Sequence, residues 1–218
     1  TMPLLREREL AQIVEKARVS HALCDARLVE AVEALRGPER PLRSIATFGD
    51  AARPDALEPH MAQAPGTFEA CPTSAEDTCL IAFTSGTTGE PKGTMHFHRD
   101  LLIIADGYAK EVLQVTPDDI FVGSPPLAFT FGLGGLAIFP LRFGAAAALL
   151  EQASPANLIS LIQEHRATVC FTAPTAYRAM LKAMEEGADL SSLRAAVSAG
   201  ETLPAPVYDE WMARTGKP

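Results

Sequence analysis

Residues 78–93, TCLIAFTSGTTGEPKG, decide the fold, because an apolar run ends there in a loop rich in glycine and hydroxyl side chains. The run at residues 78–83 is almost continuously apolar, which is typical of a strand covered on both faces. The glycines that follow allow positive φ angles and a close approach of the backbone to an anion. Exposed N–H groups can then form an anion-binding concavity. The glycines are Gly86, Gly89 and Gly93, and the side-chain donors are Thr84, Ser85, Thr87, Thr88 and Lys92.

This loop differs from the two common nucleotide-binding motifs. A Walker A loop has Gly, four residues and then Gly-Lys-Ser/Thr. Here Pro91 stands where the second glycine would be, and Gly93 rather than Ser or Thr follows Lys92. The dinucleotide fingerprint GxGxxG is absent from the loop as well. The residues alone leave two interpretations open: a phosphate cradle, or a surface turn with a solvated lysine.

Helical and strand-like segments alternate on both sides of the loop. Besides the run at 78–83, strands are predicted at residues 19–24, 42–47, 94–98, 168–172 and 193–198. Helices are predicted near the N-terminus, at residues 26–35 and 99–112, and from Ser154 and Pro174 onward. Residues 49–74 indicate a long surface connection with room for a short helix. This alternation predicts an α/β fold with a mainly parallel sheet and helices on both faces.

Particular residues sharpen these predictions. Ser154 is a suitable helix cap with Pro155 at the first helical position, and Gly187 is placed to end the helix that Pro174 opens. Tyr177 is expected on the buried face of that helix. In residues 99–112, apolar side chains recur at three- and four-residue spacing, which predicts one buried stripe. The stripe consists of Leu101, Ile104, Ala105, Tyr108 and Val112.

The composition excludes several classes of protein. The 218 residues suit one large domain or two small ones, and 47 % hydrophobic against 21 % charged residues argue against disorder. The formal net charge is −8 and no basic stripe occurs, so nucleic acid is not an expected partner. No apolar run is long enough to cross a membrane. Four cysteines without a CxxC pair indicate a reducing, cytoplasmic setting.

Two pairs of residues invite a metal interpretation that we do not favour. His96 and His98 stand two residues apart on a predicted strand, but no carboxylate or cysteine partner is obvious. Asp118 and Asp119 indicate a turn or a cap rather than ligands of Mg²⁺. No metal site is therefore predicted from the side chains of this chain.

The run TSGTTGEPKG resembles the phosphate loop of the adenylate-forming superfamily, which includes acyl- and aryl-CoA synthetases, luciferases and the adenylation domains of peptide synthetases. PPLAFTFGLGG at residues 125–135 is similar to the family's acyl-pocket segment. SAGETLP at residues 198–204 is similar to the segment that meets the adenine and the substrate carboxylate. The resemblance covers essentially the whole chain. Both later stretches are most similar to benzoate-CoA and 2-aminobenzoate-CoA ligases.

The resemblance implies a two-step reaction. A carboxylate attacks the α-phosphate of ATP, giving an acyl-adenylate and pyrophosphate, and coenzyme A then displaces AMP to make a thioester. Thr84 and Lys92 would have catalytic roles by neutralising charge on the leaving pyrophosphate, a task that Mg²⁺ would share. The resemblance implies cofactor contacts from Thr84, Ser85, Gly86, Thr87, Thr88, Gly89, Lys92, Gly200, Glu201 and Thr202.

The implied acyl pocket contains Phe129, Thr130, Phe131 and Ala199. The two phenylalanines could stack on an aromatic ring. Thr130 could hydrogen-bond a ring substituent, such as the amino group of 2-aminobenzoate. Plainer alternatives stay open, in which both phenylalanines belong to the core and Glu201 points to solvent in a tight turn.

The family's later motifs are not found in this chain. These are the YG-x-TE segment with a glutamate for Mg²⁺, the aspartate that binds ribose, and the small C-terminal domain with its adenylation lysine. We therefore expect a partial AMP-binding domain, with sublayers at about 1–77 and 78–218, that has little ligase activity alone. Its partners would be small molecules. The alternatives are another adenylate-forming ligase, acting on fatty acids or amino acids, and a non-catalytic nucleotide-binding or structural module.

Overall fold

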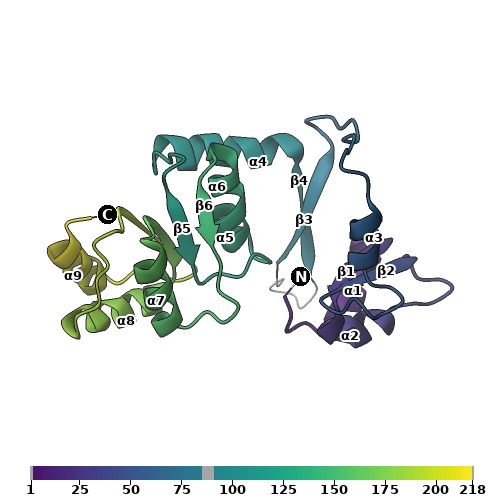
Figure 1. Ribbon diagram of the computed structural model, residues 1–218, viewed down its shortest axis with the longest axis horizontal. Coiled ribbons are helices and arrows are strands. Elements are labelled where there is room, and N and C mark those ends of the chain that lie inside the picture. The colour runs from purple at the N-terminus through teal and green to yellow at the C-terminus, as the bar shows by residue number, and fades with distance from the viewer. Residues whose placement is uncertain (1, 85–90, 218) are drawn as a thin grey trace. The chain divides into compact units, whose positions relative to one another are not determined.

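The computed structural model describes residues 2–84 and 91–217, and contacts divide the chain into two units, Thr1–His98 and Arg99–Pro218 (Figure 1). Each unit has a hydrophobic core of its own. The sequence placed a division near residue 77, whereas the contacts group residues 78–98 with the N-terminal unit.

The first unit contains a small parallel sheet and a separate antiparallel hairpin. Strands β1 (His21–Asp25) and β2 (Ser44–Phe48) pair in parallel, and β3 (Thr78–Thr84) pairs antiparallel with β4 (Lys92–Phe97). The predicted short helix in the long connection is confirmed as α3 (Glu58–Gln63). The other helices are α1 (Glu7–Ala17), η1 (Ala26–Leu28) and α2 (Val29–Glu33). Leu10, Val14, Val29, Leu35, Leu42 and Ile45 form the buried core of this unit.

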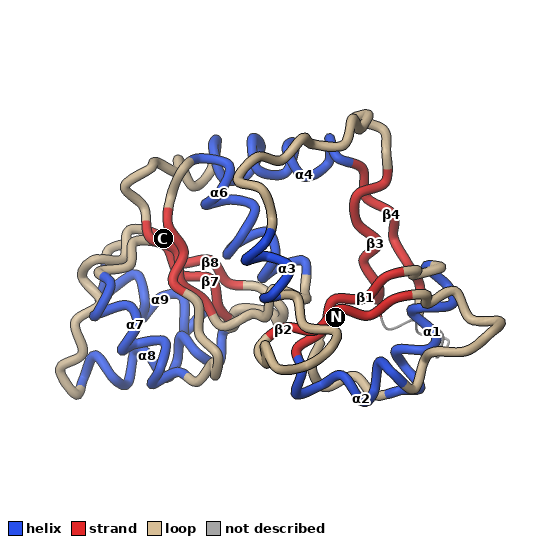
Figure 2. Tube along the Cα trace, turned by 45° about the vertical axis from the view of Figure 1, so that its right-hand side comes forward, coloured by secondary structure: helices blue, strands red, loops and turns tan. Residues whose placement is uncertain are grey.

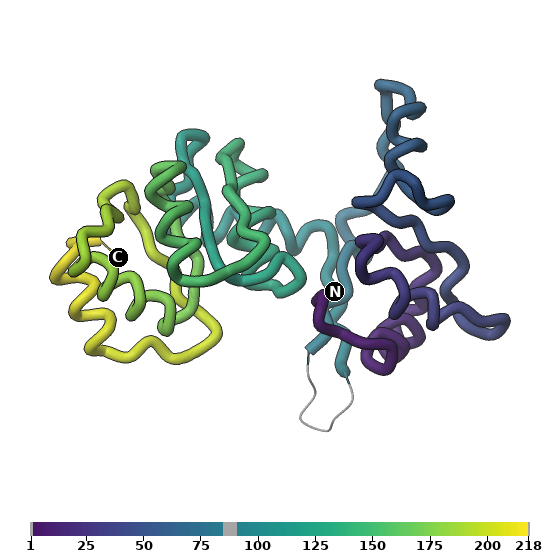
Figure 3. The backbone as a smooth tube through the Cα atoms, turned by 60° about the horizontal axis from the view of Figure 1, so that its bottom comes forward, coloured from purple at the N-terminus to yellow at the C-terminus, as the bar shows by residue number. Residues whose placement is uncertain are grey.

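The second unit is built on a four-stranded parallel sheet with the strand order β6-β5-β7-β8. Figure 2 shows β7 and β8 of this sheet in red. Its strands are β5 (Ile120–Gly123), β6 (Ala146–Ala148), β7 (Val169–Thr172) and β8 (Ala195–Ser198). The strands alternate with helical segments along the chain, which confirms the predicted α/β class with a parallel sheet. Figure 3 shows the course of the backbone through this unit, from teal to yellow. The helical segments are α4 (His98–Ile104), η2 (Ala105–Lys110), α5 (Thr130–Leu133), η3 (Gly134–Ile138), α6 (Phe139–Phe143), α7 (Pro155–His165), α8 (Pro174–Glu185) and α9 (Ala205–Thr215).

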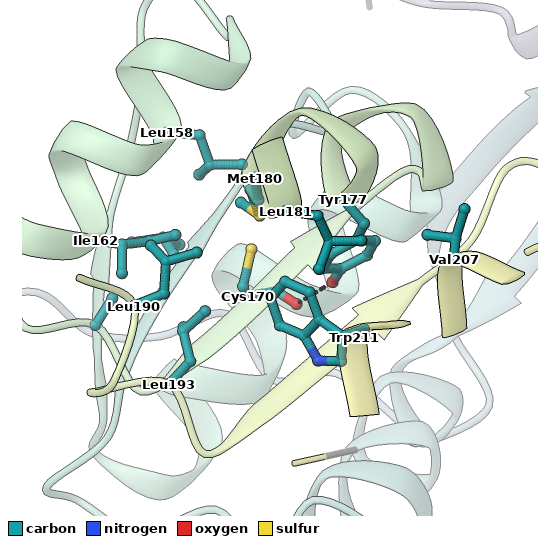
Figure 4. Close-up of a cluster of buried hydrophobic side chains, with 12 residues drawn as sticks. Leu158, Ile162, Cys170, Tyr177, Met180, Leu181, Leu190, Leu193, Val207 and Trp211 are labelled. Atoms are coloured by element: carbon teal, nitrogen blue, oxygen red, sulfur yellow. Dashed lines mark hydrogen bonds between the residues drawn. The ribbon is translucent and has the colours of Figure 1, made fainter. Parts of the chain in front are cut away.

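One face of this sheet packs against α7, α8 and α9 (Figure 4). Tyr177 from α8 is buried there, as predicted, and its hydroxyl donates to the carbonyls of Cys170, at 3.1 Å, and Val197, at 2.9 Å. Its ring makes an edge contact with Trp211 from α9. Burial raises the pKa of the Cys170 thiol to about 12. This face is therefore a packed core in which the polar tip of its tyrosine is satisfied.

The other face packs against η2, η3 and α6. Phe121 and Phe171 are fully or almost fully buried, and their ring centroids lie 6.0 Å apart. Gly135 lies against the Phe171 ring, so closely that a Cβ at this position would overlap it. Helical segments thus cover both faces of the sheet, as the sequence predicted.

Two sequence predictions were wrong in detail. The predicted stripe does not form as written, because Ala105 and Ala109 are buried while Ile104, Tyr108 and Val112 are exposed. The helix is π-helical over Ala105–Lys110, and a π turn takes more residues than an α turn. Ala105 and Ala109, which are four residues apart, therefore both lie on the buried face. Tyr108 and Val112, which follow them by three residues, are turned toward solvent.

The second error concerns β3, which was predicted to be covered on both faces. Among the described residues it pairs with β4 alone, and its interior side chains are half-buried. A two-stranded hairpin lacks the neighbouring strands and helices that bury a central strand.

Candidate functional site

The described part of the candidate phosphate loop consists of its two stems. Thr84 ends β3 and Lys92 begins β4, and the antiparallel register pairs them directly. A directly opposed pair presents both side chains on the same face. Both residues are exposed, so a hydroxyl and an ammonium are available to one ligand. The predicted contacts Ser85, Gly86, Thr87, Thr88 and Gly89 lie outside the described residues.

Two features support the stem that carries Lys92. A Cβ at Gly93 would come within 2.9 Å of the Ile81 side chain, so any larger residue here would force that side chain to move. From α1, the Lys16 ammonium donates a 2.8 Å hydrogen bond to the carbonyl of Pro91. The residue before Lys92 is therefore tied to another element, and a second positive charge lies beside this end of the loop.

The two predicted substrate segments leave the same edge of the parallel sheet. One follows β5 and the other follows β8, and β7 lies between these strands. In open α/β sheets, ligands bind outside the carboxyl ends of the strands. The topology thus brings the segments of residues 125–135 and 198–204 to the edge where a substrate is expected.

The three predicted pocket residues after β5 differ in their surroundings. Phe129 is 52 % exposed, directly before the start of α5, and Thr130 is exposed too. Phe131 is half-buried, with its ring centroid 5.4 Å from that of Phe171. Phe129 and Thr130 are therefore available to a ligand, while Phe131 packs against the core aromatics. Gly132 permits this close start of α5, because a Cβ there would overlap the backbone of Pro126.

The segment after β8 turns sharply. Ala199 is half-buried, and its N–H lies 3.4 Å from the carbonyl of Thr172, to which it donates. Gly200 has a φ of +90°, a conformation that favours glycine. Glu201 and Thr202 are exposed, which suits a contact with a ligand as well as the alternative in which Glu201 points to solvent.

The sequence reasoning missed two hydroxyl residues at this edge. The hydroxyls of Ser124 and Thr172 lie 2.5 Å apart, and either can be the donor. Thr172 is fully buried, whereas Ser124 is half-buried. The signal for them was weak: each is simply a polar residue at the end of a short apolar strand.

A buried ionic cluster lies at the opposite, amino edge of the sheet. Asp119 accepts from Arg194 at 2.6 and 2.7 Å, from the Thr168 hydroxyl at 2.7 Å and from the Thr116 N–H at 2.8 Å. Burial opposes ionisation, but these hydrogen bonds prevail and lower the pKa of Asp119 to about 2. Asp119 therefore ties together the starts of β5, β7 and β8, which fits the predicted structural role.

No metal centre is found in the described part of the chain, where no group of three or more His, Cys, Asp or Glu side chains could hold an ion. His96 and His98 do not share a strand as predicted, because β4 ends at Phe97 and His98 opens α4. Likewise, within residues 2–84 and 91–217, no helix has the length and apolarity needed to cross a membrane.

Comparisons with known proteins agree with this arrangement. The benzoate-CoA ligase of Thauera aromatica is 34 % identical over 217 residues, covering 98 % of this chain and 41 % of that enzyme. The 3-hydroxybenzoate-CoA ligase of Aromatoleum sp. (strain CIB) is 30 % identical over 220 residues, with the same coverage. A crystal structure of an anthranilate CoA ligase in complex with anthranoyl-AMP superposes with a TM-score of 0.88 at 33 % identity, covering 100 % of this chain and 43 % of that one.

The chain thus spans about two-fifths of the length of these relatives. The family model described as AMP-binding enzyme matches residues 1–218. A match over this whole range, together with relatives of the adenylate-forming type, shows that the chain belongs to the family of AMP-binding enzymes.

Proposed function

We propose that the protein is an adenylate-forming CoA ligase, which activates a carboxylic acid with ATP and transfers the acyl group to coenzyme A. The observation that carries the proposal is the Thr84–Lys92 pair at the mouth of the family's phosphate loop. The benzoate- and hydroxybenzoate-CoA ligases among the relatives support it.

In the first step a carboxylate oxygen attacks the α-phosphorus of ATP, and the bond to pyrophosphate breaks. Negative charge grows on the pyrophosphate, where preorganised donors are most effective. Lys92 and Thr84 are register partners on the hairpin, and we propose that they supply an ammonium and a hydroxyl there. In the second step the thiolate of coenzyme A attacks the acyl carbon and AMP leaves. We assign Ser85, Gly86, Thr87, Thr88 and Gly89 to the same phosphate contacts as a proposal from the motif.

Mg²⁺ would reach this site on the phosphates of ATP, as it commonly does with phosphate substrates. The described residues contain no group of three or more His, Cys, Asp or Glu side chains that could hold a metal ion. Their part is to bind and orient the phosphates.

The acid is proposed to be aromatic, of the benzoate or 2-aminobenzoate type. Phe129 is exposed and could stack on a ring, and the neighbouring Thr130 could hydrogen-bond a ring substituent. Phe131 would line the pocket from the core side. We propose that Ala199 borders the carboxylate and that Gly200, Glu201 and Thr202 border the adenine.

The test is thioester formation by the full-length protein with ATP, coenzyme A and a panel of acids. We expect benzoate or 2-aminobenzoate to give the highest kcat/KM. Acetate is the informative rival, since an acetyl-coenzyme A synthetase is 34 % identical over 151 residues. A preference for acetate would overturn the aromatic part of the proposal, and no thioester with any acid would overturn the ligase itself.

Thr130→Val tests the polar contact within the pocket. Because the change removes a hydroxyl and keeps the shape, it should lower turnover of 2-aminobenzoate relative to benzoate by about tenfold. Equal ratios in wild type and variant would contradict a role for Thr130 in choosing the substituent.

A further inference from the structure

A row of three hydroxyl side chains crosses the carboxyl edge of the second unit's sheet. The register pairs Thr172 of β7 with Ser198 of β8, and Ser124 follows Gly123, which pairs with Phe171. Residues two apart on a strand share a face. The row therefore lies on the same face as Val122 and Cys170, above the core that α7, α8 and α9 cover.

Thr172 is the centre of this row and contacts both neighbouring strand ends. Its hydroxyl forms the 2.5 Å hydrogen bond with Ser124, which opens the segment leading to Phe129 and Thr130. Its carbonyl accepts from the N–H of Ala199, in the segment that continues to Thr202. The side chain is fully buried, so water does not compete for these bonds.

Ser198 leaves capacity for a further bond in this row. Its hydroxyl oxygen is buried and has no hydrogen-bond partner among the described residues. The Ser124–Thr172 pair uses one of its two O–H groups in the mutual bond, so one donor remains. A small movement of the β8 end could bring Ser198 within reach of that donor. The ends of β5, β7 and β8 thus hold, side by side, the Ser124–Thr172 pair with its remaining donor and a hydroxyl that is unpaired among the described residues.

We propose that Thr172 is a positioning residue that couples the acyl segment, residues 124–135, to the adenylate segment, residues 198–204. Resting on the proposed function, the coupling holds the carboxylate and the adenosine phosphate in line for attack. A misplacement of about 1 Å can cost on the order of a hundredfold in rate. A buried bridge between the two segments is therefore a direct way to keep their spacing.

The experiment compares Thr172→Val, which removes the hydroxyl and keeps the shape, with Thr172→Ser, which keeps the hydroxyl. Thr47→Val is the matched control, because Thr47 is also fully buried on a strand and its hydroxyl donates to Asp55 in the first unit. Amide hydrogen exchange is measured on the full-length protein without substrates. Thr172→Val should raise exchange about fivefold or more in the acyl segment, where the bond to Ser124 is lost. It should raise exchange by a smaller factor in the adenylate segment, where the bond from the Ala199 N–H to the main-chain carbonyl remains and the effect is passed on through the shared residue. Thr172→Ser and Thr47→Val should leave both segments near wild type.

Thioester formation is measured with the same variants. We expect Thr172→Val to lower kcat about tenfold with nearly unchanged KM values, since each substrate still binds but the two are misaligned. A loss of stability alone, matched by Thr47→Val, would not give this pattern. Thr172→Ser should restore kcat.

Unchanged exchange in either segment, or a kcat of Thr172→Val equal to that of Thr47→Val, would overturn the inference. Exchange raised equally throughout β5–β8 would do so too, because it would show general destabilisation. An inactive wild type would overturn the proposed function instead, and the exchange result would still decide whether Thr172 couples the segments.

Discussion

The β3–β4 hairpin carries the proposed phosphate contacts, and the carboxyl edge of the β5–β8 sheet carries the proposed acyl and adenine contacts. The two regions are stabilised differently. The interior of β3 is half-buried, most of β4 is exposed, and Thr84 and Lys92 both face solvent. The sheet edge is backed by fully buried residues such as Val122 and Thr172. Groups that bind a ligand must be exposed and of particular types, so the hairpin carries a distinctive motif. Supporting residues need only fit their neighbours, so their sequence is less distinctive.

The largest expected effect tests the hairpin. Lys92→Ala should lower kcat/KM for ATP about a hundredfold, because it removes the charged donor that we propose for the leaving pyrophosphate. The free energy of unfolding should change by less than about 0.5 kcal/mol, since Lys92 is exposed. Steady-state kinetics and denaturant titration measure the two quantities. The control is Lys110→Ala, which changes another exposed lysine. An equal loss of kcat/KM for ATP in both variants would show that Lys92 has no special role in the hairpin.

Asp119→Asn tests the sheet, and it should lower the free energy of unfolding while leaving the kinetic constants nearly unchanged. It leaves Arg194 and Thr168 without their buried carboxylate, at a cost of about 3 kcal/mol in unfolding free energy. KM values should stay near wild type, because Asp119 lies at the amino edge. The matched control is Asp106→Asn, whose ion pair with Arg142 has both side chains 43 % exposed and should contribute much less to stability than the buried cluster. Equal costs for the two variants would contradict the buried cluster.

The same cluster predicts a dependence of stability on pH. The pKa of Asp119 is lowered from 3.8 to about 2 in the folded chain, so the unfolded chain takes up the proton first as acid is added. Its contribution to stability is complete above about pH 4 and is lost as the pH falls toward 2. Denaturant titrations at several pH values should show this loss in wild type and a smaller one in Asp119→Asn. If the free energy of unfolding fell equally with pH in both proteins, the lowered pKa of Asp119 would be contradicted.

The smallest expected effect concerns the support of the loop. Lys16→Met removes the hydrogen bond to the Pro91 carbonyl and one nearby charge, so KM for ATP should rise about two- to threefold without a change in stability. Lys16→Arg keeps a donor and a charge and should remain close to wild type. A KM for ATP that is the same in all three proteins would show that the stem needs no support from α1.

Local chemistry explains which predictions from sequence succeeded. The hydroxyl of Ser154 caps α7 by accepting from the Asn157 N–H. Gly187, with a φ of +98°, ends the helix that Pro174 opens. Both signals act within a few residues. The π turn at Ala105 shifted the buried face of its helix, and periodicity alone does not reveal such a turn.

The contacts that the sequence did not reveal are long-range. Asp119 meets Arg194 across 75 positions of the chain, and Ser124 meets Thr172 across 48. Which polar residues become partners depends on the order of the strands in the sheet. The sequence predicts parallel strands but not that order. The fold class was therefore predictable, whereas the supports of the candidate site were not.

The buried thiol of Cys170 has a practical consequence for studying this protein. A thiolate is the form that reacts with alkylating reagents, and burial suppresses it at Cys170, whereas Cys71 is exposed. In the folded chain a maleimide should therefore modify Cys71 first and reach Cys170 only when the second unit opens. The rate at which Cys170 is alkylated then measures how often the sheet opens. The measurement needs no introduced cysteine, and mass spectrometry detects the modified cysteine directly.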